Sequence, residues 1–261
     1  MKKILLFVLG VLLTQSLFAS EKEYKIKLKN SAENKIRLDI DQTDLTIEGY
    51  KGNEVLIKVQ GEFRELPERA QGLKPLTRLR DNTGVGLAMQ QEGNTLFLAK
   101  AMQGKIKIEM KVPENVALNI QESSFFDDNT FSLKSLKGEI EVKGKNATIR
   151  LEDVYGPVIA NTTSGDIYCA YAELIDRPHQ LSCTSGVLEV VLPKNSKVDL
   201  SLKTYQGEVY TDFDIVSASN KKSSSPVAMY SLNNFKGTIN GGGTSVHLQA
   251  TSNDIYLRQS K

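Results

Sequence analysis

Residues 162–169 read Thr-Thr-Ser-Gly-Asp-Ile-Tyr-Cys, and residues 183–190 read Cys-Thr-Ser-Gly-Val-Leu-Glu-Val. The two stretches align without a gap and place Gly186 21 residues after Gly165; Gly207 follows after the same interval. In each copy an aliphatic residue stands two positions after the glycine. A fixed period of about 20 to 50 residues is typical of stacked supersecondary units.

The same Gly-x-Φ-x-Φ pattern, where Φ is apolar, recurs over most of the chain. Its glycines include Gly104, and Asn253 replaces the glycine in the final copy. We expect the repeated glycines to occupy sharp corners, where a positive φ favours glycine. The corner residues predicted in this way are Gly138, Gly156, Gly165, Gly186, Gly207 and Gly237.

Short runs of alternating apolar and polar residues dominate the rest of the sequence, as in Ile36-Arg37-Leu38-Asp39-Ile40. Period-two alternation with β-branched residues indicates strands, and turn-forming residues separate the runs. Repeated strands without crossover helices predict an all-β chain folded as a parallel β-helix. An antiparallel β-sandwich is the alternative, because regularly spaced short strands fit it too.

The repeat is interrupted in two places, which we interpret as loop excursions at about residues 64–95 and 214–236. Such loops often carry binding functions. Residues 1–20 have the charged start, apolar middle and small-residue exit of a secretory signal peptide, with cleavage after Ala19 or Ser20. We therefore expect a single exported domain over residues 21–261, in the periplasm, on the cell surface or outside the cell.

The composition excludes several classes of partner. The formal net charge is +2, and removal of Lys2 and Lys3 with the leader brings it to 0, which argues against a nucleic-acid binder. No later stretch has the length of a transmembrane helix. The chain has no Trp and few aromatic residues, which weakens the case for a sugar-stacking surface.

The sequence offers no recognisable active site, and we predict no catalytic, cofactor-binding or metal-binding residue. His179 and His247 stand alone, without HExxH or CxxC spacing, and fit packing or surface roles. Paired carboxylates could hydrolyse glycans, which draws attention to Asp127-Asp128. The other acidic residues to consider follow corner positions and would form an outward acidic row, interpreted as a solvated face: Glu139, Asp166, Glu208 and Asp254.

Cys169 and Cys183 raise the question of a disulfide, since even cysteine counts in exported proteins suggest one. Aligning Gly165 with Gly186 places Cys169 beside Val190 and Cys183 beside Thr162. The thiols then lie at opposite ends of the motif, beyond the Cα separation of about 7 Å that a bridge permits. We predict free, buried thiols.

Several motifs in order resemble the bacterial putative-adhesin family, a group of exported β-helix proteins common in the Bacteroidetes. They are Leu192-Pro193-Lys194-Asn195-Ser196 as a connector, the Thr162–Ile167 repeat, Tyr210-Thr211-Asp212-Phe213, the ending around residues 237–257, and the segments at residues 72–76 and 81–87. The resemblance implies a single-stranded right-handed β-helix and no established catalytic residue.

Three functions remain open at this stage. The first is a non-enzymatic, adhesin-like envelope protein that binds a glycan or an envelope partner. The second is a polysaccharide lyase or hydrolase on the same fold. The third is a purely structural periplasmic protein, for which exposed faces are the only working surface.

Overall fold

The computed structural model describes residues 20–28, 33–63, 68–70, 72–73, 79–125, 127–217 and 234–261. The predicted leader therefore lies outside the described residues, apart from Ser20. Within the described part of the chain, no helix is long and apolar enough to cross a membrane.

The chain is all-β and forms two mixed sheets, which confirms the predicted class. In spatial order, sheet A contains β1 (Ser20–Lys27), β4 (Glu54–Gly61), β7 (Ile106–Pro113), β3 (Thr43–Tyr50), β9 (Thr130–Leu136), β11 (Thr148–Val154), β13 (Ile167–Tyr171), β15 (Leu188–Leu192), β21 (Ile255–Gln259) and β17 (Val209–Thr211). Sheet B contains β18 (Val216–Ser217), β19 (Asn234–Ile239), β16 (Val198–Thr204), β20 (Thr244–Ala250), β14 (His179–Cys183), β12 (Val158–Thr162), β10 (Ile140–Lys143), β8 (Ala117–Glu122), β2 (Lys35–Ile40), β6 (Thr95–Lys100) and β5 (Leu87–Glu92). A short 3-10 helix, η1, spans Glu68–Ala70.

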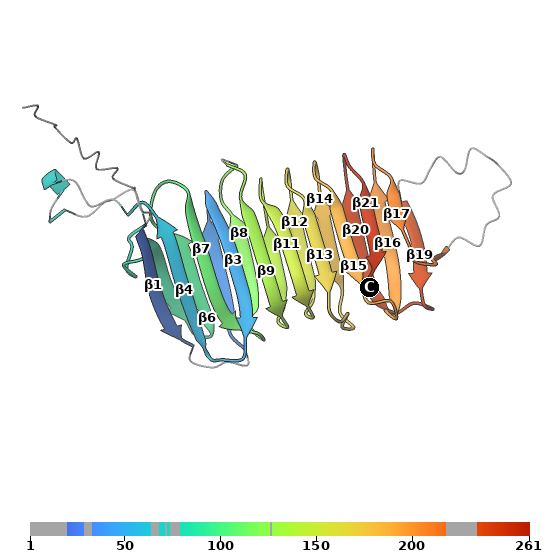
Figure 1. Cartoon of the computed structure of the whole chain (residues 1–261), viewed down its shortest axis with the longest axis horizontal. Helices are drawn as coiled ribbons and strands as arrows, with labels where there is room; N and C mark the ends of the chain where they lie inside the picture. Colours follow the sequence, from blue (N-terminus) through green and yellow to red (C-terminus); the bar gives the residue numbers. More distant parts are fainter. Residues whose placement is uncertain are drawn as a thin grey trace, which may run out of the picture.

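From β8 to β17 the chain alternates between the sheets, and neighbouring strands in the middle of each sheet run parallel. The strands lie side by side along the long axis of the molecule (Figure 1). We call a strand of sheet B and the following strand of sheet A a rung. Antiparallel pairs occur near the ends, where β1 pairs with β4, β4 with β7, β5 with β6, and β19 with β16.

Two rungs are inserted out of sequence order. The rung β2–β3 lies between β6–β7 and β8–β9, and the rung β20–β21 lies between β14–β15 and β16–β17. The C-terminus accordingly lies within the row of strands rather than at its far end (Figure 1). The 21-residue spacing suggests that the Gly186 and Gly207 repeats are direct neighbours, but the Asn253 repeat separates them, since Leu188 and Val209 both pair with Ile255.

The core lies between the sheets and follows the predicted alternation. Ile167 pairs with Leu188 and Cys169 with Val190, in the register that the sequence repeat predicts, and all four side chains are buried. Inward residues of both sheets form one hydrophobic cluster. Buried positions alternate with partly or fully exposed ones along the central strands, for example β2 and β15, which is the pattern expected when one face of a sheet is buried.

The repeated glycines are needed for a different reason than we expected. A strand of a rung begins two residues after each of five glycines, none of which has a positive φ: Gly138, Gly156, Gly165, Gly186 and Gly207. A Cβ at each would instead overlap a backbone carbonyl of a neighbouring rung; at Gly186 it would meet the carbonyl oxygen of Gly165. Close stacking of backbones, rather than bending, therefore favours glycine.

Gly237 does not occupy a corner, which corrects that assignment. It lies inside β19, opposite Leu200 of β16 and Ser217 of β18. The Gly-x-Φ pattern arises there because Thr238 and Ile239 continue an antiparallel strand, in which alternation alone reproduces the motif.

The two predicted excursions contain strands at their borders. Residues 87–92 form β5 and Thr95 begins β6, while Val216–Ser217 form β18 and Asn234 begins β19. Residues 64–67, 71, 74–78 and 218–233 lie outside the described residues. Binding roles for these loops stay predictions.

Candidate functional site

The outer face of sheet A carries a row of tyrosines near the C-terminal end of the molecule. The tyrosines Tyr168, Tyr256 and Tyr210 each follow the inward-facing aliphatic residue of their repeat, so that they point outward. That aliphatic residue is buried before Tyr168 and Tyr256 and partly buried before Tyr210. Paired positions order the row as Arg150, Tyr168, Glu189, Tyr256, Tyr210 on successive strands β11, β13, β15, β21 and β17. Residues far apart in sequence thus meet on one surface, which we call the tyrosine row.

The rings pack face to face and against cations. Tyr210 and Tyr256 stack with their centroids 5.2 Å apart and an angle of 16° between the rings. The Arg150 guanidinium lies 4.4 Å from the centroid of Tyr168, and that of Arg258 lies 5.5 Å from Tyr256. Both arginines are also ion-paired, Arg150 with Glu152 at 2.6 Å and Arg258 with Glu189 at 2.7 Å.

Acidic side chains lie two residues before each tyrosine, beside the row. The carboxylate of Asp166 accepts the backbone N–H of Val187 at 2.8 Å, and that of Asp254 accepts the backbone N–H of Glu208 at 2.8 Å. The Tyr256 hydroxyl donates to the second oxygen of Asp254 at 3.2 Å, which raises the pKa of the phenol. Bonds from neighbouring strands therefore fix the orientation of two of these carboxylates.

The acidic row predicted from the sequence is only partly correct. Asp166, Asp254 and Glu208 precede strands of sheet A and share one surface. Glu139 precedes β10 of sheet B instead, where it pairs with Arg177 at 3.5 Å. The error arises because the glycine motif occurs before strands of both sheets.

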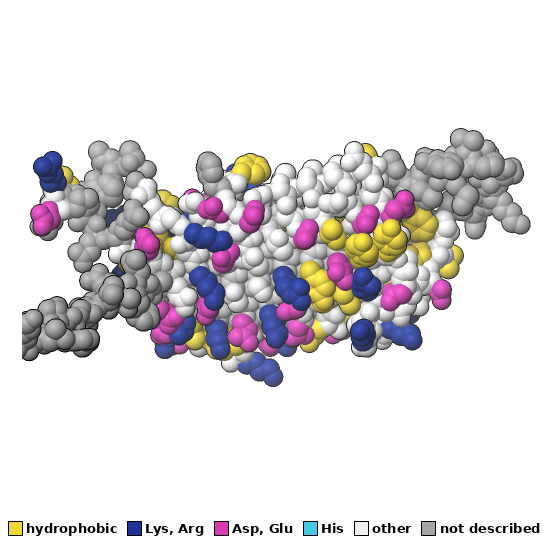
Figure 2. Space-filling model, turned by 45° about the horizontal axis from the view of Figure 1, so that its top comes forward, with side chains coloured by type: hydrophobic (Ala, Val, Ile, Leu, Met, Phe, Trp, Pro, Cys, Tyr) yellow, Lys and Arg dark blue, Asp and Glu magenta, His cyan; other side chains and the backbone are white. Residues whose placement is uncertain are grey.

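Hydrophobic side chains gather in one part of the surface (Figure 2). Figure 2 shows hydrophobic side chains, a class that includes tyrosine, gathered over the half that carries the C-terminal strands. Charged side chains of both signs are spread over both halves of the same view and also surround the hydrophobic area. Tyr210 is 51% exposed, so at least part of the tyrosine row is open to a partner.

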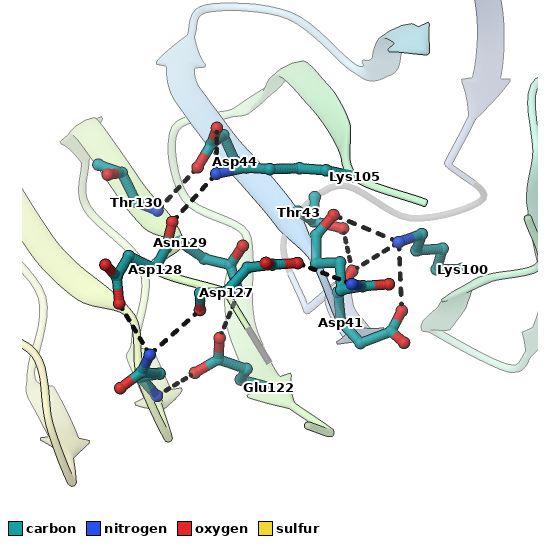
Figure 3. Close-up of polar contacts among 12 residues, drawn as sticks. Asp41, Thr43, Asp44, Lys100, Lys105, Glu122, Asp127, Asp128, Asn129 and Thr130 are labelled. Carbon is teal, nitrogen blue, oxygen red and sulfur yellow. Dashed lines mark hydrogen bonds and ion pairs between the residues drawn. The ribbon is translucent and has the colours of Figure 1, made fainter. Parts of the chain in front are cut away.

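The carboxylates considered for glycan hydrolysis lie elsewhere and do not cooperate. In Figure 3 the side chains of Asp127 and Asp128 point to opposite sides. Asp127 accepts a hydrogen bond from Gln42 at 2.7 Å, while Asp128 accepts one from Asn146 at 2.9 Å. An acid and base pair must address one glycosidic bond together, and this geometry does not provide it.

The neighbouring charges in Figure 3 hold the corner of the fold together. Lys100 has a 2% exposed side chain and donates to the carbonyl oxygens of Asp41, Gln42 and Gly104 at 2.9, 3.2 and 2.6 Å. Its burial lowers the pKa of the ammonium, which the Asp41 carboxylate, 3.4 Å away, opposes.

Glu122 plays a comparable role as a buried acceptor. Its carboxylate accepts the Asn129 amide at 2.6 Å and three successive backbone N–H groups of residues 145–147 at 2.5, 2.8 and 3.1 Å. These contacts satisfy backbone groups that would otherwise be buried without partners. The cluster is therefore explained by the structure of the corner.

A second titratable cluster lies in the core. The Tyr171 hydroxyl lies 3.1 Å from His179 Nδ1, and both side chains are buried together with Cys169. Burial lowers the pKa of His179 to about 4 and raises the pKa of the Cys169 thiol to about 12. A neutral thiol sealed from solvent is a poor nucleophile, so that the cluster is a packing unit, as predicted for His179.

The cysteines confirm the alignment made from the repeat. Cys169 pairs with Val190 in sheet A and Cys183 with Thr162 in sheet B. Both thiols are free and buried, and burial also raises the pKa of Cys183 to about 11. His247, the other histidine, lies on β20 beside Gln180 and Ser201.

Sequence reasoning missed the tyrosine row although a signal was present. The segments Gly165-Asp166-Ile167-Tyr168, Gly207-Glu208-Val209-Tyr210 and Asn253-Asp254-Ile255-Tyr256 share an acidic residue, an aliphatic residue and a tyrosine in order. The low aromatic content of the whole chain does not reveal that three of its tyrosines share one position of the repeat. Among the described residues, no three His, Cys, Asp or Glu side chains are close enough together to hold a metal ion.

Comparison with known proteins gives limited similarity. No protein-family model and no curated protein matches the chain. Among solved structures, a putative cell adhesion protein from Clostridium sporogenes ATCC 15579 is 13% identical with a TM-score of 0.47, and the alignment covers 92% of this chain and 100% of that one.

Two further solved structures cover 92% of this chain and 97% of their own. A putative adhesin from Bacteroides fragilis NCTC 9343 is 11% identical with a TM-score of 0.30. A putative lipid binding protein from Parabacteroides distasonis ATCC 8503 is 12% identical with a TM-score of 0.26. Similarities at this level establish neither the family nor the function of this chain.

Proposed function

We propose that this chain is a non-enzymatic, exported, adhesin-like envelope protein that binds a glycan or envelope partner through the tyrosine row. The observation that carries the proposal is the meeting of Tyr168, Tyr256 and Tyr210 on one face of sheet A. Tyrosine combines a large apolar surface with a polar hydroxyl, and it is enriched at recognition surfaces for that reason.

The scaffold in this proposal is a flattened, right-handed, single-stranded β-helix. Support comes from strands that alternate between the sheets while their neighbours within each sheet run parallel. Parallel crossovers are right-handed in nearly all proteins. Such a scaffold presents side chains at the strand spacing of about 4.8 Å, which gives the tyrosine row a regular and rigid geometry.

A non-enzymatic role is supported by the way in which acidic groups are engaged. Asp127 and Asp128 point apart, and Glu122 is committed to backbone N–H groups. The buried Cys169 has a raised pKa. None of these groups offers the exposed, paired arrangement that glycan cleavage requires.

The test is a glycan array combined with a pull-down from envelope extracts, using the protein without the predicted leader. We expect a saturable partner whose affinity falls about tenfold or more in Tyr210→Ala and Tyr256→Ala, as for aromatic anchors at interfaces. Phe125→Ala is the matched control, because Phe125 is 60% exposed but lies outside the tyrosine row.

Binding that survives both tyrosine substitutions would place the site elsewhere and refute the proposal. Turnover of any polysaccharide by the purified protein would refute the non-enzymatic role. If no partner binds in either screen, a purely structural role replaces the proposed one.

A further inference from the structure

We infer that the tyrosine row binds a linear polysaccharide of amino sugars that carry free ammonium groups, an inference that rests on the proposed function and names its ligand class. The first step is charge. Beside the row lie Asp166, Asp254 and Glu208 on successive or alternate strands. Within the described part of the chain, none of the three forms an ion pair with a lysine or arginine.

The two arginines that contact the tyrosine rings are already paired with carboxylates. Arg150 is paired with Glu152 and Arg258 with Glu189. What remains beside the tyrosines is therefore an excess of negative charge, which favours a cationic partner. The two arginines also show that this surface accepts planar cations against its rings, at 4.4 and 5.5 Å from the centroids of Tyr168 and Tyr256.

The carboxylates are arranged in advance of binding. One oxygen of Asp166 and one of Asp254 are fixed by backbone N–H groups of the adjacent strand, both at 2.8 Å. Groups that are already oriented lose little conformational entropy when a ligand arrives. The second oxygen of Asp254 accepts the Tyr256 hydroxyl, which couples the acidic positions to the tyrosine row.

The spacing of the charges selects the kind of polymer. Asp254 and Glu208 lie on adjacent strands and Asp166 lies two strands from Asp254, which gives intervals of about 5 and 10 Å along the row. An extended polypeptide presents side chains on one side every ~7 Å, out of step with these intervals. A pyranose residue in a β-linked chain is about as long as one strand spacing, so that successive or alternate sugars can each meet a carboxylate.

The tyrosines add the contacts that an amino sugar needs besides its charge. Tyr210 and Tyr256 stack with parallel rings on adjacent strands, so that their ring normals run along the row. Among the strands that the structure describes, β17 is the last of sheet A, so that none of them pairs with it on the side away from β21. Tyr210 is 51% exposed and can therefore contact the terminal sugar of a polymer that lies along the row, while an ammonium group of that sugar meets Glu208 or Asp254.

The experiment compares a β-1,4-linked glucosamine hexamer with the fully N-acetylated hexamer by calorimetry on the same protein. We expect the hexamer with free ammonium groups to bind about tenfold more tightly, and added salt to weaken it. Replacing Asp166 and Asp254 with Asn and Glu208 with Gln should remove that preference, because amides keep the shape and the acceptor oxygen. Glu48→Gln is the matched control, since it removes an acidic side chain from the distant half of sheet A.

Each outcome distinguishes this inference from the proposed function. Equal affinity for both hexamers, or a preference that survives the triple substitution, overturns the inference. If a neutral glycan binds and Tyr210→Ala abolishes its binding, the proposed function stands and the charged ligand class is wrong. Tighter binding of oligolysine than of the glucosamine hexamer would assign the surface to a cationic peptide and overturn the inference as well.

Discussion

Acidification from pH 7 to pH 4 should destabilise this protein chiefly through one buried histidine. His179 Nδ1 accepts the backbone N–H of Val158 at 3.3 Å and lies 3.1 Å from the Tyr171 hydroxyl, while Nε2 lies 3.5 Å from the carbonyl oxygen of Ile175. These partners assign a neutral ring with its proton on Nε2. A proton on Nδ1 would face the N–H of Val158 and would place a charge in the core.

The size and sign of the effect follow from the pKa of His179. Burial lowers it from 6.5 in the unfolded chain to about 4 in the folded protein. Between these values the unfolded chain binds the extra proton, so that the stability is complete above pH 6.5 and falls as the pH drops towards 4. Each pKa unit corresponds to about 1.4 kcal/mol, and the loss amounts to roughly 3 kcal/mol.

The assay is urea unfolding at a series of pH values between 7.5 and 4, followed by far-UV circular dichroism because the chain has no Trp. Acidic side chains also titrate near the lower limit, so the comparison is made with His179→Gln, which can accept and donate hydrogen bonds but does not titrate. The wild-type protein should lose about 3 kcal/mol more than His179→Gln across this range. The control His247→Gln retains His179 and should keep the pH dependence of the wild type.

Two results would show the reasoning to be wrong. The first is the same pH dependence in the wild type and in His179→Gln. The second is an NMR titration of the folded protein in which the buried imidazole gains its proton above pH 6. Either would mean that the ring is charged at little cost, despite an exposure of only 1%.

Three further predictions follow from packing. Gly186→Ala should lower the free energy of unfolding in urea by more than about 3 kcal/mol, because the added Cβ would overlap a carbonyl oxygen. The control Gly93→Ala, in open space at φ 56°, should lower it by only about 1 to 2 kcal/mol. Equal losses in the two variants would contradict the stacking argument. Ending the chain before β21, at residue 253, should abolish cooperative unfolding, since strands on both sides lose their partner; a cooperative transition would contradict this. Cys169 and Cys183 should resist alkylation until urea unfolds the protein, as mass spectrometry would show, because both thiols are buried with raised pKa values; rapid labelling of the folded protein would refute it.

Local spacing predicted the class of fold and the register of its central strands. The alignment of Gly165 with Gly186 placed Cys169 beside Val190 because neighbouring parallel strands repeat the same inward pattern. The same alignment did not predict the order of the rungs near the C-terminal end of the molecule, because the repeat does not encode which rung is adjacent to which. Asn253 resembles the other corner residues, and only the structure places its rung between those of Gly186 and Gly207.

The ends of the sheets illustrate the same limit. At one end, the polar strand β1 (Ser20–Lys27) forms the outer strand of sheet A. The final strand β21 (Ile255–Gln259) also carries polar residues, but it is not an edge strand, because it is paired on both sides. Alternation identifies a strand but carries no information on whether its edges are free.

The tyrosine row shows why the candidate site was not predicted. The aromatic content of the whole chain is low, and it does not show where the aromatic residues lie. The fold brings Tyr168, Tyr256 and Tyr210 together from distant segments of the sequence. Their common place in the repeat was visible, but their adjacency depends on the inserted rung. Tyr256 would otherwise lie beyond Tyr210 instead of between it and Glu189.

The inserted C-terminal rung also determines how the protein responds to mechanical force. A pull on Lys261 is transmitted to β21, whose hydrogen bonds run to β15 on one side and to β17 on the other. Parallel strands loaded along their length resist as a group in shear, whereas a strand at the edge of a sheet would open one bond at a time. Tension applied at Lys261 is therefore shared between two strand pairs, so that the chain resists unravelling from that point.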